Sequence, residues 1–219
     1  MGLLLKAILK KEGIRGVLRQ GENGCPSEET QKFALRNYPW SELSQSKWDL
    51  RRFIGDFCTG VHTSVFTACD FNHIGRQINR KGLLMADENH NVLRPKMVYG
   101  AIQNMTTLFN DLLTPVHGAG AIRYEKQTQF FTFRHPNGNM AVFWDRSNTP
   151  SDDLTAGKAD ILVRDFAIES PILIDVLTGN VYQIPQETIQ TCGDLTVFAD
   201  IPSADTPFVL ADRNIVELK

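Results

Sequence analysis

The sequence predicts an α/β first part followed by an all-β second part that folds as an antiparallel β-sandwich. In the first half, apolar residues recur at helical spacing, most clearly over residues 50–58 and 98–112. After about residue 115, short β-branched and aromatic runs alternate with turn signals, a pattern typical of a sandwich. The charge changes sign as well, because residues 1–112 hold 15 Lys+Arg and 11 Asp+Glu, whereas residues 113–219 hold 8 and 14.

The first half is expected to alternate between helix and strand. Its predicted elements are a helix over 3–12, a strand over 14–18, a loop over 21–41, an amphipathic helix around 50–58, a buried strand over 63–68, a polar irregular segment over 71–94 and a helix over 95–112. Gly13 ends the first helix, and Pro95 suits the first turn of the last one because its missing N–H is not needed there.

The second half is expected to contain only strands and turns. The predicted strands cover 124–135, 140–144, 161–164, 172–176, 181–184, 195–199, 208–211 and 215–218. Turns are predicted at Pro136-Asn137-Gly138 and at Leu177-Thr178-Gly179-Asn180. The domain boundary therefore falls after residue 114, with an α/β part over 1–114 and a β-sandwich over 115–219.

Composition excludes several classes of function. The 219 residues carry a net charge of -2 and no block of Lys/Arg that would track phosphates, so no nucleic-acid partner is expected. No apolar stretch approaches the ~18 residues of a membrane span, so no membrane partner is expected either. The four cysteines form no C-x-x-C pair and are interpreted as isolated thiols. We expect neither a metal site nor a cofactor.

The segment Arg19-Gln20-Gly21-Glu22-Asn23-Gly24-Cys25-Pro26-Ser27 is the main candidate for chemistry. Glu22 follows a predicted strand and is flanked by glycines, which permit a sharp turn and the close approach of a ligand. Barrel enzymes place catalytic groups at the carboxyl ends of parallel strands. A solvated loop glutamate is the simpler alternative for Glu22 taken alone.

An ordered set of motifs resembles the C-terminal part of retaining glycoside hydrolases of clan A. The set comprises Gln20-Gly21-Glu22-Asn23-Gly24, Tyr38-Pro39-Trp40, Lys47-Trp48-Asp49-Leu50-Arg51-Arg52, Arg94-Pro95-Lys96-Met97-Val98-Tyr99 and Ile174-Asp175-Val176-Leu177-Thr178-Gly179-Asn180-Val181-Tyr182. The resemblance covers nearly the whole chain. It implies the last two strands and helices of a (β/α)8 barrel, from about the sixth helix to the eighth, followed by a β-sandwich. A complete barrel needs roughly 250 residues, which this chain does not have.

The resemblance also implies roles for individual residues. Glu22 matches the carboxylate nucleophile, which forms a glycosyl-enzyme intermediate that water hydrolyses. Its acid/base partner in the clan is the glutamate of an Asn-Glu pair, and no such pair occurs in this sequence. The implied function is a glycoside hydrolase present as a C-terminal fragment. Its partners would be an oligosaccharide or glycoside substrate and the missing N-terminal barrel portion.

Four further residues are candidates for substrate binding. Tyr38 and Trp40 could stack on the apolar faces of sugar rings, with loop packing as the alternative. Asp70 and Asn72 follow the second predicted strand and could reach sugar hydroxyls, although a strand-end cap or turn is the simpler explanation for them. Two other functions stay open for the chain: a non-catalytic module that binds carbohydrate or a protein partner, and an inactive truncated gene product.

Overall fold

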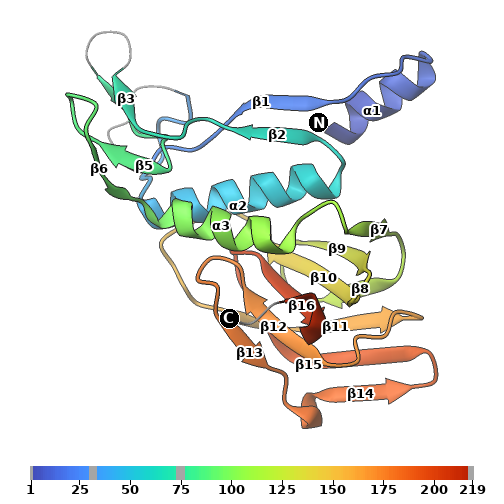
Figure 1. Ribbon diagram of the computed structural model, residues 1–219. Helices are drawn as coiled ribbons and strands as arrows, with labels where there is room; N and C mark the ends of the chain where they lie inside the picture. Colours follow the sequence, from blue (N-terminus) through green and yellow to red (C-terminus); the bar gives the residue numbers. More distant parts are fainter. Residues whose placement is uncertain (1, 30–33, 73–76, 217–219) are drawn as a thin grey trace. The chain divides into compact units, whose positions relative to one another are not determined.

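The computed structural model describes residues 2–29, 34–72 and 77–216. The chain divides into two compact units, Met1–Gly100 and Ala101–Lys219, here called the N-terminal and C-terminal units (Figure 1). Each is described separately below. The expected boundary after residue 114 lies further along the chain than this division, beyond the last long helix.

The N-terminal unit alternates helices with short strands. Its elements are α1 (Gly2–Lys11), β1 (Arg19–Asn23), α2 (Glu42–Cys58), β2 (His62–Val65), β3 (Phe71–Asn72), β4 (Ile78–Asn79), β5 (Leu84–Ala86), β6 (Val92–Pro95) and the start of α3 (Met97–Leu108). Strands β1 and β2 pair in parallel, and α2 is the crossover between them. The β3–β4 and β5–β6 pairs are antiparallel.

Helix α2 is the best-defined element of this unit. Ser41 caps it, because the Ser41 side chain accepts the backbone N–H of Ser44 while the Ser44 hydroxyl accepts the N–H of Ser41. The apolar residues Leu50 and Ile54 on one face are fully buried. The helix ends at Cys58, and Gly60 follows with a φ of 64°, a conformation that favours glycine.

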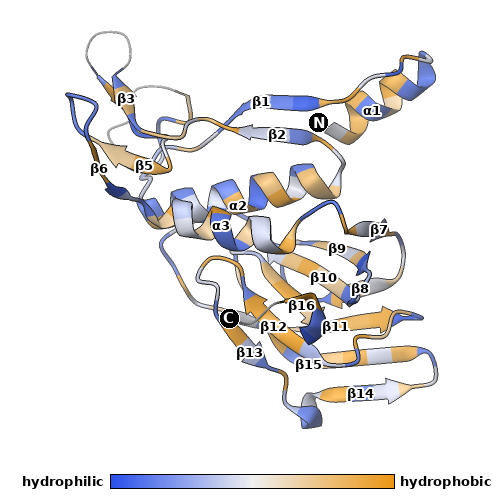
Figure 2. Cartoon of the chain, viewed as in Figure 1, coloured by the Kyte–Doolittle hydropathy of each residue, from blue (hydrophilic) through white to orange (hydrophobic). Residues whose placement is uncertain are grey.

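Helix α1 buries none of its side chains. Its apolar residues remain largely exposed, with exposed fractions of 65% for Leu3, 65% for Leu4 and 46% for Ile8. Figure 2 shows both hydrophobic (orange) and hydrophilic (blue) residues along α1. Within the described residues, no helix combines the length and the hydropathy needed to cross a membrane.

The C-terminal unit consists of two antiparallel sheets. Its strands are β7 (Thr114–Val116), β8 (Gly120–Arg123), β9 (Thr128–His135), β10 (Gly138–Asp145), β11 (Gly157–Arg164), β12 (Pro171–Asp175), β13 (Val181–Gln183), β14 (Ile189–Cys192), β15 (Leu195–Ser203) and β16 (Phe208–Asp212), with short 3-10 turns at Gln186–Thr188 and Arg213–Ile215. One sheet has the order β13-β12-β16-β10-β9-β7 and the other β14-β15-β11-β8.

A single apolar core joins the two sheets. Phe143 and Leu210 from the first sheet belong to the same buried cluster as Ile161 and Phe198 from the second, and all four are fully buried. Figure 2 shows the hydrophobic residues concentrated on these inner strands. Side chains from two sheets that interdigitate in this way define a β-sandwich. The coarse prediction of an α/β part followed by antiparallel sheets is therefore confirmed.

Several element boundaries differ from the sequence prediction. Residues 14–18 form no strand. The strand in this region is β1, which begins at Arg19, five residues after the predicted start at Ile14. Val17, inside the predicted strand, is 74% exposed. Pro95 ends β6 instead of starting the helix, and four short strands, β3 to β6, lie in the described residues of the segment 71–95. Strands β7, β8 and β14 were not predicted. In the expected strand over 215–218, Ile215 ends a 3-10 turn, and residues 217–219 lie outside the described residues.

Candidate functional site

Glu22 lies inside β1, not in a loop after a strand as the sequence predicted. Arg19 pairs with His62 and Asn23 with Val65, and the register is irregular between Gln20 and Asn23, where Gly21 and Glu22 lie. The Glu22 side chain is exposed. A register irregularity redirects side chains locally, and such features are frequent beside active sites.

The neighbour of Glu22 anchors the strand. Asn23 is 5% exposed, and its side-chain amide donates to Thr63 Oγ1 at 3.0 Å and to Asp56 Oδ2 at 3.3 Å. These bonds connect β1 to β2 and to α2. Burial raises the pKa of Asp56, although Arg52 opposes the shift. Asn23 thus fixes the backbone beside an exposed carboxylate.

Chain packing requires a glycine at position 24. A Cβ at this position would lie 1.9 Å from the carbonyl oxygen of Phe66. The backbone N–H of Phe66 also donates to the carbonyl of Asn23 at 2.9 Å. The two chain segments that leave β1 and β2 therefore meet directly at Gly24.

Helix α2 holds the segment after β1 through the Cys25 peptide. Gln45 Nε2 donates to the Cys25 carbonyl at 2.8 Å, and the Asp49 carboxylate accepts the Cys25 N–H. Gln45 and Asp49 lie one turn apart on α2 and are 0% and 1% exposed. Among the described residues, Gln45 Oε1 and Asp49 Oδ1 have no hydrogen-bond partner. Burial raises the pKa of the Cys25 thiol and keeps it protonated.

Lys81 brings a positive charge to this cluster. It is 7% exposed, and its carbonyl accepts the N–H of Thr67, beyond the end of β2. Burial lowers the pKa of Lys81, and nearby acidic groups, Asp49 and Glu22 among them, oppose this shift. Lys81 therefore couples electrostatically to both the buried Asp49 carboxyl and the exposed Glu22 carboxylate.

Asp70 is the centre of a second buried cluster. Lys96 Nζ donates to Asp70 Oδ1 at 2.6 Å, and neither side chain is exposed. The backbone N–H of Gly82 also donates to Oδ1, and Arg80 contacts Oδ2 at 3.2 Å. Both carboxylate oxygens of Asp70 thus have partners inside the protein. Burial lowers the pKa of Lys96, although the hydrogen bond to Asp70 opposes that shift.

The other predicted binding residues lie in different environments. Trp40 is 3% exposed, donates through Nε1 to the Leu35 carbonyl at 2.6 Å, and packs edge-on against Trp48. Tyr38 is half-buried, with its ring centroid 4.6 Å from that of Trp40. Asn72 donates to the Glu88 carbonyl at 2.6 Å. The rings of Tyr38 and Trp40 therefore contact each other. Asp70 belongs to the separate cluster around Lys96, and Asn72 is bonded to the Glu88 carbonyl.

The sequence did not predict that buried charged residues lie beside the candidate site residues. Asp49, Lys81 and Lys96 were not predicted to contribute, although Asp49 and Lys96 lie in the quoted motifs. One signal was available. The first half of α2 is mostly polar, with only Leu43 and Trp48 apolar before Leu50, and a helix of that kind places polar groups inward when it packs. In the described segments, no group of three His, Cys, Asp or Glu side chains could hold a metal ion.

Replacing Asp49 by asparagine is expected to stabilise the protein at neutral pH by about 1–3 kcal/mol, because the amide keeps an oxygen that can accept the Cys25 N–H and removes a carboxyl whose ionisation burial disfavours. Burial raises the pKa of Asp49 in spite of Lys81 and Lys96. The folded state therefore binds this proton more tightly than the unfolded chain, whose pKa is about 3.9, and wild-type stability falls as pH rises above that value. Asparagine has no carboxyl proton, so the variant lacks this pH-dependent loss of stability.

Urea unfolding of both proteins from pH 5 to pH 8 measures this effect. The stability difference should grow with pH until the pH passes the raised pKa of the folded state. The exposed control Asp152→Asn should show no such trend, since Asp152 lies at the surface. A difference that is constant across the pH range would show that Asp49 is ionised in the folded protein.

Neither a protein-family model nor a curated protein matches the sequence. Among solved structures, a rhamnosidase from Novosphingobium sp. PP1Y is similar over 80% of this chain, with a TM-score of 0.31 and 16% sequence identity. This chain covers 17% of the length of that structure.

Proposed function

We propose that this chain is the C-terminal part of a retaining glycoside hydrolase and that Glu22 is its nucleophile. The observation that carries the proposal is the position of Glu22, exposed in the parallel strand β1 at its register irregularity. The β1–α2–β2 unit has the topology of one barrel repeat, and we assign its strands to the seventh and eighth of eight. The ordered motifs support the same assignment.

In the proposed reaction, a Glu22 oxygen attacks the anomeric carbon while an acid protonates the departing glycosidic oxygen. Water then attacks the same carbon and releases Glu22, and the former acid takes the proton of that water. The acid/base carboxyl must lie about 5–5.5 Å from Glu22. Because the sequence holds no Asn-Glu pair, we assign the acid/base to polypeptide outside these 219 residues.

The four candidate binding residues fall into two pairs, one partly exposed and one buried. Tyr38 and Asn72 are partly exposed, and we propose that they contact the sugar directly. Trp40 and Asp70 are 3% and 2% exposed, and we propose that they support the site from beneath. Trp40 would do so by packing against Tyr38, and Asp70 by holding Lys96.

Glu22→Gln in the full-length enzyme is expected to abolish turnover of an aryl glycoside while the protein stays folded. The amide preserves the shape of the side chain but cannot form the glycosyl ester. Glu88→Gln is the matched control, because Glu88 is also an exposed glutamate of the N-terminal unit. Hydrolysis of the aryl glycoside is followed by release of the phenol. Equal turnover by Glu22→Gln and wild type would refute the assignment.

A further inference from the structure

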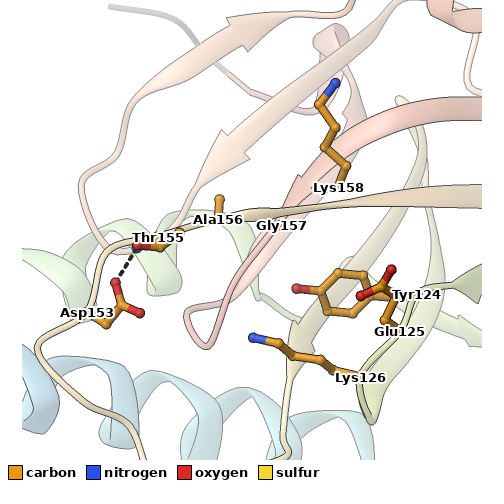
Figure 3. Close-up of a pocket in the computed structure, with 8 residues that line it drawn as sticks. All are labelled: Tyr124, Glu125, Lys126, Asp153, Thr155, Ala156, Gly157 and Lys158. Atoms are coloured by element: carbon orange, nitrogen blue, oxygen red, sulfur yellow. Dashed lines mark hydrogen bonds between the residues drawn. The ribbon is translucent and has the colours of Figure 1, made fainter.

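The C-terminal unit carries a pocket that the proposed nucleophile site does not use. It has a volume of about 410 Å³, within the range of small-molecule sites. Two chain segments form it: residues 124–126, which follow β8, and residues 153–158, which lead into β11. Figure 3 shows the side chains that line the pocket.

Tyr124 forms one wall of the pocket and is fixed by close packing. The Tyr124 hydroxyl contacts the Ser203 carbonyl at 3.3 Å, and a Cβ on Gly157 would lie 2.5 Å from that hydroxyl and 3.0 Å from the ring. The absence of a side chain at Gly157 therefore allows the ring to lie against the β11 backbone. The half-buried ring adds apolar surface to an otherwise polar pocket.

Asp153 and Thr155 form the opposite wall. Asp153 Oδ1 accepts the backbone N–H of Thr155 at 2.8 Å, and the Asp153 N–H donates to Ser151 Oγ at 3.3 Å. In Figure 3, Lys126 and the Tyr124 hydroxyl point toward this wall, whereas Lys158 points away from it. Apart from Lys158, the charged groups that line the pocket are thus one cation, Lys126, and two carboxylates, Glu125 and Asp153.

The balance of these charges indicates the chemistry of the ligand. Lys126 Nζ lies 3.4 Å from Asp145 Oδ2, and the bond to Asp145 raises the pKa of Lys126, so Lys126 is a protonated donor whose charge is already compensated. Asp153 is an acceptor on the other side. A neutral ligand with hydroxyl groups can accept from Lys126 and donate to Asp153, whereas an anion gains little from a compensated cation. The Tyr124 ring suits the C–H face of such a ligand.

We propose that this pocket binds a neutral sugar, as a carbohydrate site of the sandwich separate from the Glu22 site. The site does not depend on the proposed nucleophile, because all its residues belong to the C-terminal unit. Sugar binding here would hold the polypeptide on a carbohydrate whether or not Glu22 is active.

Titration of the full chain with D-glucose, D-galactose or maltose, followed by amide chemical shifts, tests this proposal. At millimolar concentrations, at least one of these sugars should cause saturable shifts confined to residues 124–126 and 153–157. D-glucuronate and inorganic phosphate should bind more weakly than that sugar. The absence of saturable shifts with all three sugars, or tighter binding of either anion, would overturn the proposal.

Variants then test the individual side chains. Lys126 is exposed, so the Lys126→Gln variant should fold normally. It should bind sugar about tenfold more weakly, because a charge-assisted hydrogen bond is lost. Tyr124→Ala should weaken it at least as much. The matched controls are Arg134→Gln, which removes an exposed cation on β9 outside the pocket, and Tyr182→Ala, which truncates an exposed tyrosine on β13. Unchanged affinity in Lys126→Gln would overturn the assignment, whatever the stability of Tyr124→Ala.

Discussion

Replacing Lys96 by methionine is expected to destabilise the N-terminal unit by about 3–5 kcal/mol. Lys96 Nζ donates to Asp70 Oδ1 at 2.6 Å, to Ser27 Oγ at 3.0 Å and to the Arg80 carbonyl at 3.0 Å. Its side chain is 0% exposed, so water cannot replace these bonds. Methionine keeps most of the side-chain volume. Asp70, however, then remains a buried carboxylate with Arg80 as its only paired cation among those described above.

Urea unfolding measures this loss, and hydrogen exchange locates it in residues 1–100. Lys158→Met is the matched control, because the Lys158–Asp200 pair is 3.6 Å apart and its side chains are 73% and 62% exposed. Exposed pairs of this kind contribute between about 0 and 1 kcal/mol. Adding Asp70→Asn to Lys96→Met should recover part of the lost stability, since the uncompensated charge is then gone. A loss in Lys96→Met as small as that of the control would contradict the structural role of the pair.

The sequence was most informative where an element carries a clear apolar pattern. Helix α2 was predicted because its apolar residues recur at helical spacing, and strands β10 and β16 were predicted because continuous apolar runs are typical of strands buried on both faces. Edge strands β8 and β14 were missed because half-exposed strands carry little of this signal. The pattern was misleading at residues 14–18, where the apolar residues Ile14 and Val17 remain exposed.

Strand β1 shows why part of the site could not be predicted. Its sequence, RQGEN, has no strand propensity, and its extended form depends on pairing with β2, some forty residues away. The motif around Glu22 was visible in the sequence, but the register irregularity that contains it was not. The partners of Asp70 were also hidden, because Arg80, Gly82 and Lys96 meet it only through chain packing.

The same packing predicts that Gly82→Ala prevents normal folding of the N-terminal unit, or costs more than about 3 kcal/mol where the unit still folds. A Cβ on Gly82 would lie 2.1 Å from the backbone nitrogen of Asp70 and 2.3 Å from the carbonyl carbon of Cys69. Backbone atoms cannot move aside as a flexible side chain can. The Gly82 N–H also donates to Asp70 Oδ1, so any shift of Gly82 disturbs the pair with Lys96.

Gly55→Ala is the control, and it should change stability in the opposite direction. Gly55 lies within α2 with no atom within 4 Å of an added Cβ, and alanine in a helix interior is favoured over glycine by about 0.5–1 kcal/mol. Thermal unfolding of the two variants separates a steric effect from a general effect of adding a methyl group. If Gly82→Ala unfolded at the wild-type temperature, the segments at Asp70 and Gly82 could not be in the contact described, and the buried pair would lose its structural basis.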